Sequence, residues 1–169
     1  MKLHTFPIRS AALLALLITL CSTAMAKAPV VAAEEAVELT GWLHVEDHSF
    51  SGATVAVKVN GAIREAIVSE TGRFTVTLPA GTEAVLRFEM PGHLTKEVVV
   101  DTHFAQDGVP GQRVRRVRFA VILELERHMA GFRYQGPVGS IGFDQGGGCM
   151  AVSRERKLVP AKRQATMVF

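Results

Sequence analysis

Apolar and polar residues alternate along most of the chain between residues 53 and 101. A period of two predicts strands that bury one face and expose the other. The apolar positions of these runs are Val55, Val57 and Val59; Phe74, Val76 and Leu78; and Ala84, Leu86, Phe88 and Met90. We therefore expect a series of half-buried strands in this region.

Short turn signals separate these runs. They are Asn60-Gly61, Thr71-Gly72, Pro79-Ala80-Gly81 and Pro91-Gly92. Asn60-Gly61 predicts a type I′ hairpin because both positions accept a positive φ. Residues 62–69 should then return antiparallel to the valine-rich strand.

Two further strands are predicted on either side of this region. The first covers Val37–Val45, where Gly41 marks a bulge or a kink. The longest covers Val114–Arg127 and is apolar on one face and partly apolar on the other. Strands that recur at this spacing predict an all-β, antiparallel sandwich of about seven strands.

The C-terminal part is less regular. Pro137–Phe143 and Cys149–Arg154 are expected to form a β-hairpin, and residues 155–169 show no clear period and are expected to be loose. The sequence thus divides into a signal peptide (1–26), a leader (27–36), the sandwich (37–127) and a C-terminal hairpin with a basic tail (128–169).

The N-terminus has the pattern of an export signal. Lys2 and Arg9 precede an apolar run over residues 11–20, and Ala24-Met25-Ala26 supplies a small-x-small cleavage pattern. The run is too short to span a bilayer. A periplasmic or secreted protein that begins at Lys27 is expected.

The chain has two cysteines, Cys21 and Cys149. Cys21 would permit a lipid anchor, but Leu20 stands where a lipoprotein signal usually has a small residue. Cys149 is the single cysteine of the mature chain, so the fold is expected to hold without an internal disulfide.

Charge is distributed unevenly. Residues 27–112 include 6 basic and 12 acidic side chains, whereas residues 113–169 include 11 basic and 4 acidic ones. The densest cluster is Arg113, Arg115, Arg116 and Arg118. This cluster could bind another envelope protein or an anionic glycan or lipid surface. The alternative is an exposed strand face whose arginines pair with Glu124 and Glu126 or with other acidic neighbours. With one Trp and one Tyr and an export signal, nucleic acid is not an expected partner.

A second candidate site lies near the end of the first strand. His44, Asp47 and His48 stand close enough to supply metal ligands, and zinc sites use three or four such groups. The alternative is a loop of solvated side chains. No cofactor is otherwise expected.

Three segments carry a family resemblance: GATVAVKVN, SETGRFTVTLPAGT and LRFEMPGHLTKEVVVD. Together they resemble the carboxypeptidase regulatory-like domain, a transthyretin-like β-sandwich, over about Val37–Asp101. The matching positions are Gly72, Phe74, Pro79, Gly81, Gly92 and His93. The resemblance implies a fold and assigns no catalytic residue.

These observations favour an exported, non-catalytic binding or accessory module of the bacterial cell envelope. Two alternatives remain: a small metal-dependent hydrolase that uses His44, Asp47 and His48, and a lipid-anchored structural protein.

Overall fold

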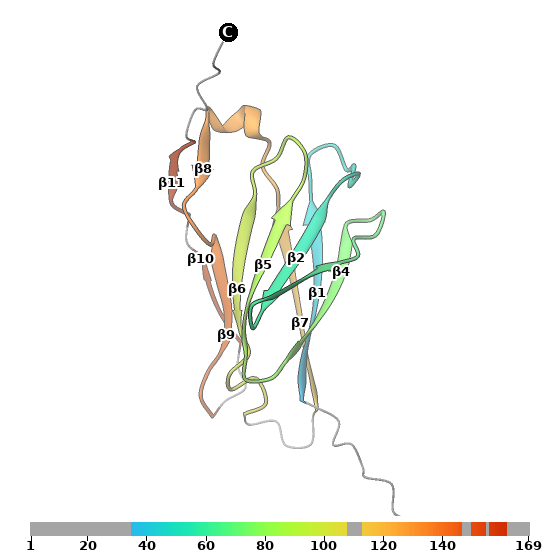
Figure 1. The fold of residues 1–169 in the computed structure, drawn as a ribbon, viewed down its shortest axis with the longest axis vertical. Coiled ribbons are helices and arrows are strands. Elements are labelled where there is room, and N and C mark those ends of the chain that lie inside the picture. Colours follow the sequence, from blue (N-terminus) through green and yellow to red (C-terminus); the bar gives the residue numbers. More distant parts are fainter. Residues whose placement is uncertain (1–34, 108–112, 147–149, 155, 162–169) are drawn as a thin grey trace, which may run out of the picture. The chain divides into compact units, whose positions relative to one another are not determined.

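The computed structural model describes residues 35–107, 113–146, 150–154 and 156–161 (Figure 1). The predicted signal peptide, most of the leader, Cys21, Cys149 and residues 162–169 lie outside these ranges. The described residues belong to one compact unit, which begins at residue 33. Among them, no helix is long and apolar enough to cross a membrane.

The described residues form strands and one short 3₁₀ helix. In chain order these are β1 (Ala36–His44), β2 (Thr54–Val59), β3 (Ala62–Ala66), β4 (Arg73–Pro79), β5 (Glu83–Glu89), β6 (Lys96–Asp101), β7 (Val114–Ile122), η1 (Glu126–Met129), β8 (Phe132–Tyr134), β9 (Gly139–Phe143), β10 (Met150–Arg154) and β11 (Leu158–Pro160).

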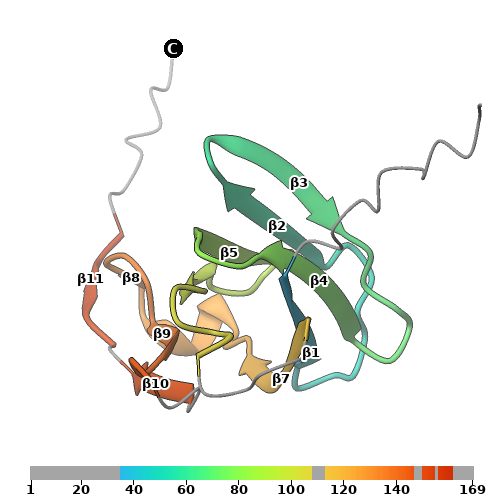
Figure 2. The same ribbon diagram turned by 90° about the horizontal axis from the view of Figure 1, so that it is seen from below.

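The strands form two main sheets that pack face to face (Figure 2). The smaller sheet has the order β4-β1-β7, and the larger has the order β10-β9-β6-β5-β2-β3. The predicted β-sandwich is confirmed. The purely antiparallel arrangement was wrong, because β7 runs parallel to β1 and β9 runs parallel to β6. Both parallel pairs join strands that are far apart in sequence, as parallel pairing requires.

The hairpin at Asn60-Gly61 is confirmed. β2 and β3 pair antiparallel, and Asn60 and Gly61 have φ values of 50° and 80°. The apolar positions of β2, β4 and β5 face inward as expected, since Val55, Phe74 and Leu86 are fully or almost fully buried.

Gly41 does not form a bulge or a kink, contrary to the prediction. β1 pairs with β4 without interruption from Ala36 opposite Pro79 to Trp42 opposite Arg73. Gly41 lies opposite Phe74, and a Cβ atom added at Gly41 would overlap the Phe74 ring. Position 41 therefore lacks a side chain because the aromatic ring occupies that space.

Phe74 lies at the centre of an aromatic cluster that joins the two sheets. Its ring centroid is 5.5 Å from that of Phe88 on β5 and 5.7 Å from that of Phe119 on β7. Both are within the range of favourable aromatic contacts. The core therefore fixes β4, β5 and β7 relative to one another.

The longest predicted strand ends early: β7 stops at Ile122 and not at Arg127. Beyond that point the chain leaves the smaller sheet and crosses to the larger one. The Leu123 N–H donates to the His44 carbonyl, and the Leu94 N–H donates to the Glu124 carbonyl. The residues from Glu126 on form η1. The alternation of apolar residues in the sequence therefore extends beyond the last residue of the strand, which is why the predicted strand was too long.

The predicted C-terminal hairpin is confirmed, since β9 and β10 pair antiparallel. It extends the larger sheet, because β9 also pairs with β6. Residues 158–160 were expected to be irregular, but they form β11 and pair with β8. A three-residue strand is too short to give a detectable period.

Thr102 organises the turn between β4 and β5. Its side chain is fully buried, its hydroxyl oxygen accepts the N–H of Thr82 at 2.8 Å, and it lies 2.8 Å from the carbonyl oxygen of Pro79. Thr102→Val keeps the shape and removes the hydroxyl, which leaves the Thr82 N–H and the Pro79 carbonyl without this partner.

We expect Thr102→Val to lower the free energy of unfolding by about 1–3 kcal/mol. The measurement is urea denaturation, and the control is Thr75→Val on the exposed face of β4. The control should change stability by less than about 0.5 kcal/mol. Equal effects of the two substitutions would contradict the role of the Thr102 hydroxyl.

Candidate binding groove

The predicted arginine cluster lies on or beside β7, an edge strand of the smaller sheet. Its members are Arg113, Arg115, Arg116 and Arg118. Arg116 is 74% exposed, and its Nε lies 3.5 Å from a carboxylate oxygen of Glu38 on β1. Glu38 and Arg116 are neighbours in register. Arg116 thus pairs with an acidic neighbour, as the alternative interpretation expects, but this neighbour is Glu38 and not Glu124, whose carboxylate pairs with Lys96.

The backbone of β7 has one edge that faces away from β1. The Arg113 carbonyl accepts the Ala36 N–H, and the Leu123 N–H donates to the His44 carbonyl. Because successive residues of a strand direct their hydrogen-bonding groups to opposite edges, the odd-numbered residues face β1. The even-numbered residues present their N–H and C=O groups to the opposite edge: Val114, Arg116, Arg118, Ala120 and Ile122.

A groove of about 410 Å³ adjoins this edge. We call it the β7 groove; it is lined by residues 118–122 of β7, by β6, β9 and β10, and by Val138 and Arg156. It lies on the side where β7 and the β9–β10 hairpin are the outermost strands of their sheets (Figure 2). The groove lies where a fourth strand of the smaller sheet would pair with β7.

The β7 groove combines apolar and basic side chains. Ile122 and Val152 are 57% and 56% exposed, and both line the groove, so their apolar surfaces lie close together. Arg118, Arg154 and Arg156 supply exposed guanidinium groups. Within the part of the chain that the structure describes, the side chains that line the groove include these basic groups and no carboxylate. The charge of the groove therefore favours an anionic or acidic partner.

Lys96 lies at the floor of the groove and has a different role from the exposed arginines. Its side chain is 3% exposed, its ammonium lies 2.5 Å from the Glu124 carboxylate, and it is 5.3 Å from the centre of the Tyr134 ring. Burial lowers the pKa of Lys96, while the nearby Glu124 acts in the opposite direction. Burial, together with Glu124, raises the pKa of Tyr134. These three side chains tie β6 to the segments that follow β7.

The structure brings one of the four predicted arginines, Arg118, into the groove. Sequence reasoning missed the basic and apolar residues of β10 and its flank, among them Met150, Val152 and Arg154. The available signal was the excess of basic residues after position 113, which indicated this part of the chain but not individual positions.

The predicted metal ligands lie in and beside the loop after β1. His44, Asp47 and His48 are exposed; the Asp47 carboxylate accepts the Ser49 N–H, and His48 Nδ1 lies 3.2 Å from the Glu46 carbonyl. In the described part of the chain, no group of three or more His, Cys, Asp or Glu side chains is placed to hold a metal ion. The loop side chains instead bond to their own backbone.

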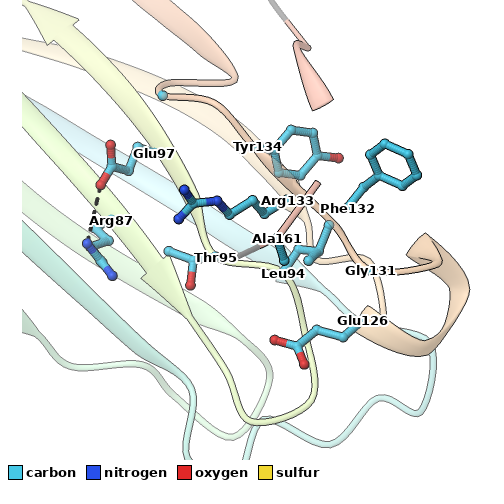
Figure 3. A pocket seen from close by; sticks show the side chains of 11 residues that line it. Arg87, Leu94, Thr95, Glu97, Glu126, Gly131, Phe132, Arg133, Tyr134 and Ala161 are labelled. Atoms are coloured by element: carbon cyan, nitrogen blue, oxygen red, sulfur yellow. Dashed lines mark hydrogen bonds and ion pairs between the residues drawn. The ribbon is translucent and has the colours of Figure 1, made fainter. Parts of the chain in front are cut away.

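A second hollow, of about 460 Å³, lies between η1, β8 and the start of β6 (Figure 3). Arg133 extends into it from β8, and Glu126 projects from η1. Arg87 on its wall is already paired with Glu89 at 2.6 Å and with Glu97 at 3.5 Å. Because charges of both signs line this hollow, it offers less selectivity by charge than the β7 groove.

No protein-family model and no curated protein matches the chain. Solved structures that are similar include two type II cohesin–X-dockerin complexes from Acetivibrio cellulolyticus, one a C-terminal and one an N-terminal interface mutant. The first has 12% identity and a TM-score of 0.34, and the match covers 52% of this chain and 56% of the other. The second has 12% identity and a TM-score of 0.36, with 53% and 58% covered.

A structure of S.CueP matches at 18% identity with a TM-score of 0.34, over 53% of this chain and 62% of the other. The chain thus spans less than two thirds of the length of these structures. Similarities at this level do not assign a function.

Proposed function

We propose that this protein is an exported, non-catalytic binding or accessory module of the bacterial cell envelope, and that it contacts another protein through the β7 groove. The observation that carries the proposal is the groove itself, in which exposed apolar and basic side chains adjoin an unpaired strand edge. Exposed apolar residues grouped beside charged ones are typical of contact surfaces.

The sequence supplies the cellular context of the proposal. The signal-like residues 1–26 support export to the periplasm or beyond, and the turn motifs of residues 51–101 support kinship with carboxypeptidase regulatory-like domains. Modules of this kind act through their surfaces, and strand edges and grooves supply main-chain and side-chain contacts to partners.

The test is capture of partners from envelope extracts by the purified chain without residues 1–26. Arg118→Glu combined with Arg154→Glu reverses two charges in the groove and should reduce recovery of the wild-type partner at least about tenfold, since like charges at an interface are strongly unfavourable. Arg73→Glu is the matched control, because Arg73 is exposed on β4 at the opposite edge of the same sheet.

Recovery of the partner by the wild type and by Arg73→Glu, with loss in the double variant, would support the proposal. Equal recovery by all three proteins would show that the contact lies elsewhere. Circular dichroism and urea denaturation confirm beforehand that the variants are folded.

A further inference from the structure

We propose that the β7 groove binds an extended segment of the partner polypeptide, which adds to the β4-β1-β7 sheet as a fourth strand. The segment carries acidic side chains that alternate with apolar ones. This inference rests on the proposed function and specifies the chemistry of the partner and the geometry of its binding.

In the ranges that the structure describes, the free edge of β7 has unused hydrogen-bonding capacity. Its even-numbered residues direct N–H and C=O groups away from β1, and among the described residues none of these groups has a backbone partner. All five residues are exposed, from Val114 to Ile122. An exposed edge of nine residues is long enough to template an added strand, which would satisfy these groups.

The two faces of such an added strand would meet different surroundings. On the outer face of the sheet, its side chains would lie beside Arg116 and Arg118, which are exposed on that face. On the inner face, they would meet the apolar lining that Val138, Ile141 and Val152 provide. A strand with period two places acidic groups on the first face and apolar groups on the second.

Charge also decides between a foreign segment and a second copy of this chain. If β7 of one molecule paired with β7 of another, Arg116 and Arg118 would meet the same arginines, and like charges on adjacent strands are destabilising. Arg154 and Arg156, which also line the groove, add to this repulsion. An acidic partner strand removes the repulsion and replaces it with attraction.

The test uses a synthetic peptide of about nine residues in which Glu and Val alternate, matched in length to β7. Amide hydrogen exchange of the protein is followed by NMR with and without the peptide. We expect exchange at Arg116, Arg118 and Ala120 to slow by about tenfold or more. The odd-numbered amides of β7 already bond to β1 and should change little. A peptide with Lys in place of Glu should not bind.

N-methylated peptides separate strand addition from simple charge attraction. Methylation of every second backbone nitrogen removes the donors of one edge only. One of the two alternate methylated peptides should lose binding, and the other should bind like the parent, because only one edge can face β7. Equal binding of both methylated peptides would overturn strand addition.

The outcomes also separate this inference from the proposed function. If the Glu–Val peptide fails to bind while the envelope partner is still captured and still lost in the Arg118→Glu, Arg154→Glu variant, strand addition is wrong and the groove remains a protein contact. If the chain binds phosphatidylglycerol vesicles and not the peptide, the groove recognises an anionic membrane and the inference fails.

Discussion

Gly41→Ala should lower the free energy of unfolding by about 3 kcal/mol, near the upper end for overpacking of a core. A Cβ at position 41 would overlap Cζ of Phe74 and lie 2.5 and 2.7 Å from its Cε1 and Cε2. Phe74 is 1% exposed and packs against Phe88 and Phe119. The ring therefore has no free space into which it can turn.

Gly142→Ala is the matched control for Gly41→Ala. Gly142 also lies within a strand, and a Cβ there would meet no atom within 4 Å. This substitution should be neutral or stabilise by a few tenths of a kcal/mol, because it restricts the unfolded chain. Urea denaturation of both variants measures the difference. If Gly41→Ala is as mild as Gly142→Ala, the interpretation of Gly41 is wrong.

The double variant Gly41→Ala, Phe74→Leu tests whether the overlap with the Phe74 ring causes the loss of stability. Phe74→Leu alone should be destabilising, because it leaves a gap in the aromatic cluster. When position 41 carries alanine, the smaller side chain at position 74 relieves the overlap, so the two effects should be clearly less than additive. Additive effects would show that the cost of Gly41→Ala has another origin.

Gly41 also shows which part of the fold the sequence could predict. The period of two and the Asn60-Gly61 turn depend on neighbouring residues, and both were recovered. The reason for Gly41 lies in a residue 33 positions away, on a strand whose register cannot be read from a single sequence. The glycine was therefore interpreted as a local bulge.

The same distinction applies to the β7 groove. Arg118 was found because it belongs to a local cluster, whereas Val152 and Arg154 join it only when β9 pairs with β6 in parallel. A parallel pair has no turn between its strands, so no short sequence signal marks it. The excess of basic residues after position 113 indicated that the C-terminal part of the chain is involved. Which of these residues line the groove depends on how the strands pair.

Substitution of Lys96, which forms a buried ion pair with Glu124, should also lower the free energy of unfolding strongly. Lys96→Met keeps most of the aliphatic stem and removes the ammonium, which leaves the Glu124 carboxylate in a low-polarity setting without its partner. Removal of one member of a buried pair costs about 3–5 kcal/mol, and the partial exposure of Glu124, at 25%, places the expected loss near 3 kcal/mol.

Lys96→Met combined with Glu124→Gln should recover most of this loss, because no unpaired charge remains. Urea denaturation near neutral pH measures both variants. Arg87→Met is the control for an exposed ion pair, and it should cost less than about 1 kcal/mol. If Lys96→Met behaves like Arg87→Met, the Lys96–Glu124 pair does not act as a buried pair.

The pH dependence of stability tests the lowered pKa of Lys96. The unfolded chain protonates this lysine with a pKa near 10.5, and burial lowers the pKa in the folded protein. Between the two values the unfolded chain binds more protons, so the contribution of Lys96 makes the free energy of unfolding rise with pH in that window. Below the folded pKa both states are protonated, and this contribution is constant.

Tyr134 acts in the opposite direction, because its pKa is raised in the folded protein and the folded state keeps its proton longer as pH rises through 10. The measurement is therefore made in a Tyr134→Phe background, with and without Lys96→Met. The alkaline rise should be present with Lys96 and absent with Met at that position. A rise of equal slope in both proteins would assign it to other groups and would contradict the burial of the lysine charge.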